Sequence, residues 1–208
     1  SGWSTVTLPF NTFSKSLGYN PNPGNEVLDL TDVKNFSFAA ATGKDSGGAK
    51  VDGIELYHAG GSTRPVCPVS PSVVDDFEGY ADRQAALTAG WFQDGTGYVG
   101  IESVASDAAN AQPGQSCATN VLSIGWDTTV APNWGVAGLN LDAAGEDWSD
   151  FDGIRFAFKG SDNGGTLEFE IGEGPVVGID AERYRSSTTI SDDTSGWSTV
   201  TLPFSTFS

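Results

Sequence analysis

The amino-acid sequence predicts an all-β protein folded as a two-sheet sandwich of the jelly-roll type, and three observations lead to this prediction. About ten short runs are rich in β-branched and aromatic residues or alternate between apolar and polar positions. Clusters of Gly, Pro, Asn and Asp separate these runs and are typical of tight turns. No segment shows a sustained helical period, so the strands must bury their apolar faces against one another.

The clearest expected strand is the run at 154–159, because Ile154, Phe156 and Phe158 fall on one face and Arg155 falls on the other. The sequence Asn163-Gly164-Gly165 follows it and is typical of a turn. A short helical turn is expected only at 105–111, since Pro113 and Gly114 would end it. In chain order, the expected strands are 3–8, 35–40, 53–57, 74–77, 118–126, 134–141, 154–159, 166–171, 183–190 and 197–202.

The first and last expected strands are copies of each other. Residues 1–14 and 195–208 agree at thirteen of fourteen positions, and Asn11 against Ser205 is the exception. Since the copies begin at positions 1 and 195, the chain spans one period of a 194-residue tandem repeat, which is long enough for a whole domain per repeat.

The phase of this repeat indicates a circularly permuted sandwich. A Gly/Pro/Ser-rich linker is expected at 61–73, residues 1–60 are expected to be the C-terminal part of one module, and residues 74–208 the N-terminal part of the next. The first part either closes the sandwich within the same chain, which we favour, or completes a neighbouring copy by strand exchange.

A fixed order of motifs carries a family resemblance. It begins with DDFEGY at 75–80, WGVAGLNL at 134–141 and the long run at 148–173, and it continues with GWSTVTLPFSTF at 196–207 and, in the permuted part, VDGIELY at 51–57. This order resembles the galactose-binding-like jelly rolls of the family-eleven carbohydrate-binding modules and the related complex-I-intermediate-associated domains. The resemblance implies a jelly roll that binds polysaccharide, with β-glucan-like glycans as the expected ligands, and does not cleave it.

The expected carbohydrate site combines charged side chains with aromatic platforms, because sugars present both hydroxyl groups and apolar C–H faces. Alternation places Arg183 and Arg185 on one face of their strand, opposite Tyr184, and it places Glu168 and Glu170 on one face of theirs. In the resembling family the glycan lies across the concave sheet, where these four charged groups would converge. The alternative is an ordinary solvated face with cross-strand Glu–Arg pairs. The candidate platforms are Tyr80, Tyr98, Trp126, Trp134 and Tyr184.

The resemblance also implies one structural calcium ion near the opening and final strands. The matching positions are Asp76, Glu78 and Asp52, whose carboxylates are ligands of the kind that calcium prefers. A second acidic stretch at 146–153 lacks the full EF-hand spacing and is expected to be a solvated loop.

The amino-acid composition limits the kinds of partner that the protein is expected to bind. Ten Lys and Arg against 27 Asp and Glu give a net charge of −17, which argues against nucleic acid and anionic membranes. No apolar run approaches the roughly 18 residues of a membrane span. The acidic, Lys-poor composition suits an extracellular or cell-surface setting, where Cys67 and Cys117 would form one disulfide rather than remain unrelated thiols. Without an initiator Met or a secretion signal, the sequence is expected to be a piece of a longer chain.

Three classes of function follow from these patterns. The first is a non-catalytic, extracellular polysaccharide-binding module in a tandem array. The second is a structural repeat of a filament, stalk or adhesin whose partners are adjacent copies of the same repeat. The third and most remote is a retaining glycosidase, because the run from Glu168 to Glu173 resembles the E-x-D-x-x-E strand of laminarinase-type enzymes. A triad built on the single His58 is not expected.

Overall fold

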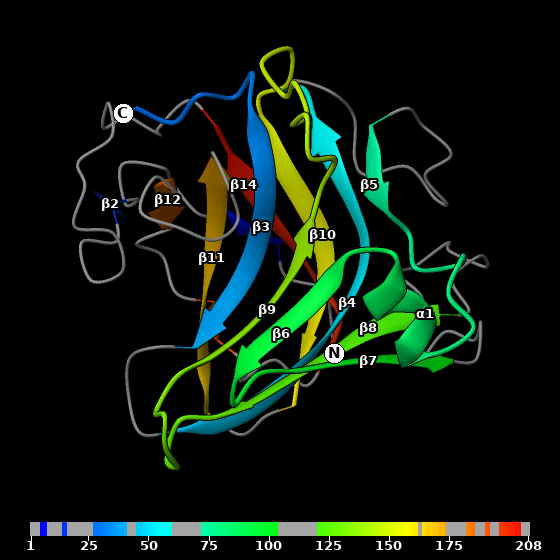
Figure 1. Ribbon diagram of the computed structural model, residues 1–208, viewed down its shortest axis with the longest axis vertical. Helices are drawn as coiled ribbons and strands as arrows, with labels where there is room; N and C mark the ends of the chain where they lie inside the picture. The colour runs from blue at the N-terminus through cyan, green and yellow to red at the C-terminus, as the bar shows by residue number, and fades with distance from the viewer. Residues whose placement is uncertain are drawn as a thin grey trace.

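The computed structural model confirms the all-β sandwich (Figure 1). It describes residues 5–7, 14–15, 27–40, 45–59, 72–103, 120–161, 164–173, 182–185, 190–191 and 196–204. Within them, two β-sheets pack face to face, and a single short helix, α1 (Arg83–Thr88), lies beside them. Sheet B, with strands β3, β6, β9 and β11, lies in front of sheet A in Figure 1.

Each sheet contains seven described strands, six of which form a continuous ladder. Sheet A runs in the order β1 (Thr5–Thr7), β14 (Ser198–Pro203), β10 (Gly153–Gly160), β4 (Ser46–Tyr57), β8 (Asn120–Asp127) and β7 (Tyr98–Ser103), with β5 (Val73–Asp75) also paired to β4. Sheet B runs in the order β2 (Ser14–Lys15), β12 (Glu182–Arg185), β11 (Thr166–Glu173), β3 (Val33–Ala40), β9 (Gly135–Asn140) and β6 (Trp91–Gly95), with β13 (Ile190–Ser191) also paired to β11. All described pairings are antiparallel except that of β1 with β14.

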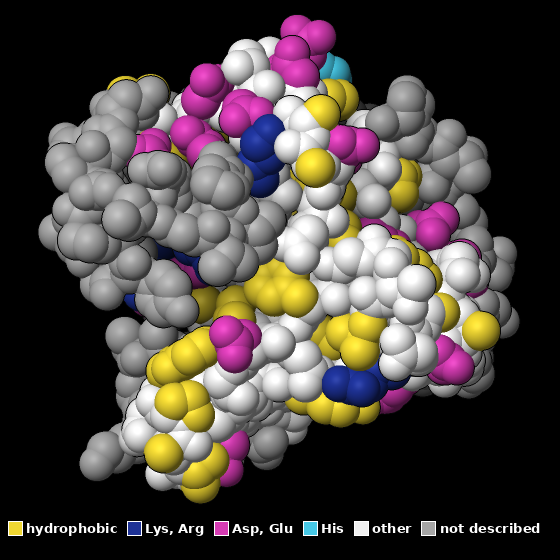
Figure 2. Space-filling view, viewed as in Figure 1, with side chains coloured by type: hydrophobic (Ala, Val, Ile, Leu, Met, Phe, Trp, Pro, Cys, Tyr) yellow, Lys and Arg dark blue, Asp and Glu magenta, His cyan; other side chains and the backbone are white. Residues whose placement is uncertain are grey.

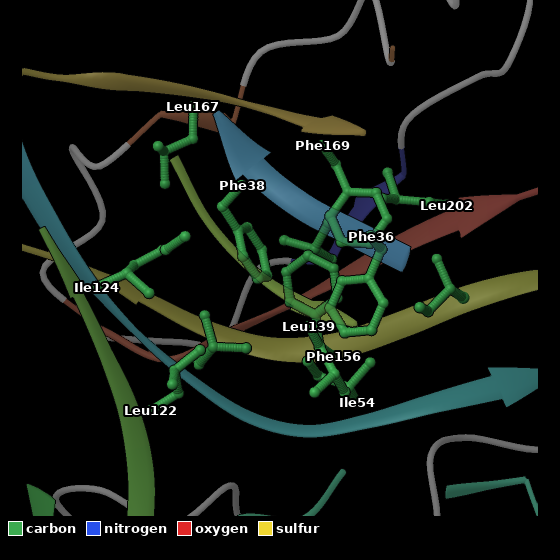
Figure 3. Close-up of a cluster of buried hydrophobic side chains, with 14 of the residues drawn as sticks. Phe36, Phe38, Ile54, Leu122, Ile124, Leu139, Phe156, Leu167, Phe169 and Leu202 are labelled. Atoms are coloured by element: carbon green, nitrogen blue, oxygen red, sulfur yellow. The ribbon is translucent and has the colours of Figure 1, made fainter. Parts of the chain in front are cut away.

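The core lies between the sheets and is rich in phenylalanine (Figure 3). Alternation along each strand directs Phe36 and Phe38 of β3, Phe156 of β10 and Phe169 of β11 inward, and all four are at most 1% exposed. Phe169 stacks on Phe36 and on Phe156 at 5.5 and 5.7 Å between ring centroids, and Phe38 meets Phe156 edge-on at 5.3 Å. These rings join strands of both sheets, so the two sheets share one core.

The central strand of each sheet comes from the first sixty residues. In sheet A, β4 lies between β10 and β8, and in sheet B, β3 lies between β11 and β9. Ile54 and Val51 of β4 are fully buried, as is Phe36 of β3. Strands β3 and β4 are therefore part of the same sandwich as the described strands that follow residue 72, while the division of the chain into repeat halves and a linker stays a prediction.

The two copies of the duplicated strand lie side by side. β14 fills the position next to β10, where Val200 and Leu202 enter the core. β1 adds to the outer edge of β14 in parallel, with Thr5 opposite Thr199, Val6 opposite Val200 and Thr7 opposite Thr201. Each residue therefore lies opposite its own copy, at a sequence offset equal to the repeat period.

Strands β6 and β7 and helix α1 were not predicted from the sequence. The Asp94-Gly95 turn, which the sequence did signal, connects β6 of sheet B to β7 of sheet A, and Gly97 and Gly100 interrupt the apolar pattern around β7. Helix α1 has only six residues, which is too short to show a period, and it begins at Asp82, whose side chain caps the backbone N–H of Ala85 at 2.9 Å. The helical turn expected at 105–111 lies outside the described residues, and no described helix is long and apolar enough to cross a membrane.

Candidate functional site

The outer face of sheet B, which points away from the core, carries most of the predicted charged residues. We define it by the strand register, since residues that pair across neighbouring strands project to the same side. One cross-strand row crosses five strands of the sheet. The row contains Arg185 of β12, Glu170 of β11, Ser37 of β3, Gly138 of β9 and Phe92 of β6.

One end of this face is a network of two carboxylates and two guanidinium groups. Arg185 donates from Nε and Nη2 to Glu170 Oε1 at 3.0 and 2.8 Å, and its Nη1 lies 2.7 Å from Glu168 Oε2. Arg183 Nη1 lies 3.6 Å from Glu170 Oε2, and the Ser37 hydroxyl donates to that same oxygen at 3.2 Å. The four predicted residues therefore do converge on one face, as ion-paired neighbours.

Burial sets the electrostatics of this network. Glu170 is only 5% exposed. Burial raises the pKa of Glu168, and the Glu170 carboxylate raises it further, while Arg185 opposes both effects. Burial and Glu170 therefore favour the neutral form of Glu168, and Arg185 is the neighbour that favours its charged form.

The middle of the face is built from small residues and amides. A Cβ atom on Gly172 would overlap the amide of Asn35, and one on Gly138 would lie 2.6 Å from Cζ of the Phe92 ring. Asn35 is opposite Asn140 in the register, and the Asn140 Oδ1 is buried without a hydrogen-bond partner among the described residues. Asn35 and Ser37 were not among the predicted site residues. They alternate with the buried Phe36 and Phe38, and this alternation is the sequence signal for their position on the outer face.

An aromatic side chain closes the other end. Phe92 is half-buried on β6 and lies over the glycine at position 138. Figure 2 shows this side of the molecule, with hydrophobic side chains near the middle, over the region of β6 and β9, and separate groups of acidic and basic side chains around them. Phe92 was missed because Trp91, beside it in the sequence, is the residue that enters the core.

The predicted aromatic platforms are scattered rather than gathered. Trp126 and Tyr184 are 5% and 6% exposed and belong to the core, so their assignment as sugar platforms is wrong. For Tyr184 the cause is alternation itself, because the face opposite Arg183 and Arg185 is the inner one. Its hydroxyl lies 2.8 Å from both the Val27 carbonyl and a Glu182 carboxylate oxygen.

The other three platforms occupy different places. Trp134 is half-buried just before β9, and its ring lies against Gly95 at the β6–β7 turn. Tyr80 is half-buried, donates to Asp75 Oδ2 at 2.7 Å, and lines an open depression of about 470 Å³ beside α1. Tyr98 is 49% exposed, but it lies on the outer face of sheet A, across Gly100 and beside the Arg83 guanidinium.

The residues matched to a calcium ion do not form a metal centre by themselves. Asp52 is buried on β4 opposite Ala157, whereas Asp76 and Glu78 follow β5. Asp76 accepts a hydrogen bond from the Glu78 backbone at 3.1 Å, and Glu78 accepts one from the Asn120 backbone at 3.1 Å. In the part of the chain that the structure describes, no group of three or more His, Cys, Asp or Glu side chains is arranged to hold a metal ion.

The neighbouring Asp75 is the buried carboxylate of this motif. It accepts hydrogen bonds from the Trp91 indole at 2.8 Å, the Tyr80 hydroxyl at 2.7 Å and the Phe77 backbone at 2.8 Å. Burial raises its pKa, and these three donors partly offset that effect. Through the Trp91 indole, Asp75 links β5 of sheet A to β6 of sheet B.

The glycosidase interpretation fails on the position of Glu173. Alternation along β11 puts Glu173 on the side opposite Glu168 and Glu170, and its carboxylate accepts a hydrogen bond from the Asp29 backbone. Burial and the nearby carboxylates of Glu182, Asp29 and Asp32 raise its pKa to about 7. The three glutamates therefore do not share a site. Cys67 and Cys117 lie outside the described residues, so their disulfide stays a prediction.

The outer face of this two-sheet sandwich combines an aromatic ring, amides and ion-paired side chains, which are groups able to contact the C–H faces and hydroxyls of a sugar. Comparison with known families agrees, since residues 61–208 match the carbohydrate binding domain of family 11. The chain therefore belongs to this family of carbohydrate-binding modules, whose domains are non-catalytic. Searches of curated proteins and of solved structures gave no match.

The matched range leaves out the central strand of each sheet. β3 and β4 precede residue 61, yet they lie between matched strands in both sheets. Residues 61–208 alone would therefore be missing a strand from the middle of each ladder.

Proposed function

We propose that the outer face of sheet B binds a β-glucan chain, the type of ligand associated with this family. The observation that carries the proposal is the cross-strand row from Arg185 through Glu170, Ser37 and Gly138 to Phe92. Five adjacent strands make this row roughly 19 Å long at about 4.8 Å per strand, which is the length of a short oligosaccharide.

Each part of the row suits a part of the sugar. The Phe92 ring offers an apolar surface to a pyranose C–H face, and Gly138 leaves the room that this ring needs to lie against the sheet. The guanidinium and carboxylate groups offer donors and acceptors to the hydroxyls, and their mutual ion pairs fix them in place before binding. The unpartnered Oδ1 of Asn140 is a further acceptor beside the row.

The proposal is tested with two matched arginine variants, each from an Arg–Glu pair on an outer face. Arg185→Lys keeps the charge but loses the forked geometry, and we expect it to weaken binding to soluble β-glucan by about 10-fold in calorimetry. Arg155→Lys, on the outer face of sheet A, should bind as the parent does. Equal affinities of all three proteins, or no binding of β-glucan by the parent, would overturn the proposal.

The duplicated strand supports a second proposal about context. We infer that this module is one unit of a tandem array in an extracellular or cell-surface protein, because thirteen of fourteen residues recur after one domain length. If the parent binds no polysaccharide, the same duplication favours the structural alternative, in which the units are repeats of a stalk, filament or adhesin.

A bound calcium would need oxygen ligands in addition to Asp52, Asp76 and Glu78, and a fall in melting temperature on chelation would support it.

A further inference from the structure

The edge of sheet A at β14 has an unusual neighbour. A sheet edge exposes a row of backbone donors and acceptors that can pair with another strand. Here the neighbour is β1, whose three residues pair with Thr199, Val200 and Thr201. β1 is therefore bound by backbone pairing to a strand that has the same sequence as itself.

β1 and β14 lie in identical stretches of sequence. Residues 1–10 and 195–204 are identical, so Val6, Leu8 and Phe10 correspond to the buried Val200, Leu202 and Phe204. The in-register parallel pairing places Val6 opposite Val200, a core residue. A one-residue slip would move every side chain of β1 to the opposite face of the sheet, so the observed register keeps matching positions on matching faces.

β1 lies at the end of the sheet A ladder, whereas β14 lies inside it, between β1 and β10. β14, in contrast, is held by six pairs with β10 and by its core residues. The edge can therefore exchange β1 without disturbing the strand that completes the sandwich.

We propose that the β14 edge of sheet A is a homotypic strand-addition surface, and that its partner is a second copy of this chain. The second copy contributes its own residues 5–7 as a parallel strand, in the register seen here, in place of the resident β1. Because every copy carries both the donated strand and the receiving edge, such contacts link molecules head to tail. This surface is separate from the outer face of sheet B, so association leaves the proposed glycan site open.

The test uses full-length variants with one added cysteine each, mixed under mild oxidation. In the proposed register, Thr5→Cys of one molecule lies opposite Thr199→Cys of another at the roughly 5 Å Cα separation that a disulfide requires. The control pair is Thr7→Cys with Thr199→Cys, which is displaced by two residues, or about 7 Å along the strand. Peptide mass mapping identifies the linked positions, so links that involve Cys67 or Cys117 are told apart.

We expect the 5–199 link between different molecules to form about 10-fold more than the 7–199 link, and to increase with protein concentration. The double variant Thr5→Cys/Thr199→Cys in one chain reports the resident arrangement. If it closes within the chain while the mixed single variants give no intermolecular link, β1 does not exchange and the proposal is wrong. Equal formation of the 5–199 and 7–199 links would also overturn it, because the contact would then lack a register.

Discussion

On the outer face of sheet A, Arg155 pairs with Glu55, whereas on the outer face of sheet B, Arg185 is shared by two glutamates. Arg155 Nε donates to Glu55 at 2.8 Å, and its guanidinium lies over the Tyr57 ring at 5.6 Å. Glu55 is 1% exposed, so this pair is enclosed by its surroundings. Arg185 instead bridges Glu168 and Glu170, in a face that also carries amides, glycines and Phe92.

The difference teaches that an Arg–Glu pair on a sheet can serve structure or recognition, depending on what surrounds it. Near the sheet A pair, Trp197 packs with Val121 and Ala157 in a second small apolar cluster on the same outer side. On sheet B, Gly138 and Gly172 let the Phe92 ring and the Asn35 amide pack close to the sheet between the charged end and the aromatic end. Both pairs are largely buried, but only the sheet B pair borders a row of polar and aromatic side chains, which is why we propose recognition there.

The largest expected effect comes from removing one carboxylate on each face. Glu55→Gln leaves the Arg155 charge without a counter-charge in an enclosed place, and we expect a loss of about 2–3 kcal/mol in the free energy of unfolding. Glu168→Gln should cost less than about 0.5 kcal/mol, because burial already raises the pKa of Glu168 and Arg185 keeps its two bonds to Glu170. Urea denaturation measures both values, and equal losses would remove the contrast between the faces.

The next effect separates the two faces by an aromatic side chain on each of two consecutive strands. Phe92 of β6 projects from sheet B and Tyr98 of β7 projects from sheet A. We expect Phe92→Ala to weaken β-glucan binding by about 10-fold, equivalent to roughly 1.4 kcal/mol of lost stacking. Tyr98→Ala, the matched control, should leave affinity unchanged. A loss with Tyr98→Ala and none with Phe92→Ala would move the glycan site to sheet A.

The smallest effect is a pH dependence at the inner end of β11. Glu173 has a pKa of about 7 in the folded protein, above the ordinary glutamate value of 4.5, so the folded state holds the proton more tightly than the unfolded state does. Its contribution to stability is therefore fully present below about pH 4.5 and is lost as the pH rises through 7. We expect the melting temperature of the parent to fall relative to Glu173→Gln between pH 5 and 8.

The matched control for this pH dependence is Glu102→Gln. The hydrogen bond from Lys50 lowers the pKa of Glu102, so removing Glu102 changes the pH dependence only in the acid range. If Glu173→Gln and the parent keep a constant difference in melting temperature from pH 5 to 8, the raised pKa of Glu173 is wrong.

The sequence predicted the sandwich and the charged end of the site because both depend on local alternation. The pattern of Ile154, Phe156 and Phe158 identified the inner face of β10, and the spacing of Glu168, Glu170, Arg183 and Arg185 placed them on one side of two strands. These features repeat every second residue, so they are visible without knowing which strands are neighbours.

The rest of the site depended on which strands are neighbours, and the sequence does not give this. Phe92 and Ser37 belong to the site only because β6, β9 and β3 follow β11 across the sheet. Trp126 and Tyr184 were predicted to be sugar platforms, but both side chains lie on the inner face of their strands and are buried in the core. Tyr98 is exposed but lies on the other sheet, which no local pattern distinguishes.

The central position of β3 and β4 has a consequence for how the chain acquires its structure. β4 ends at Tyr57, while its long neighbours β8 and β10 begin at Asn120 and Gly153. During synthesis, β3 and β4 leave the ribosome before β8, β9, β10 and β11, the strands that flank them in the two sheets. We expect slow, late assembly dominated by distant pairings, with premature encounters between unfinished sheets as its main hazard.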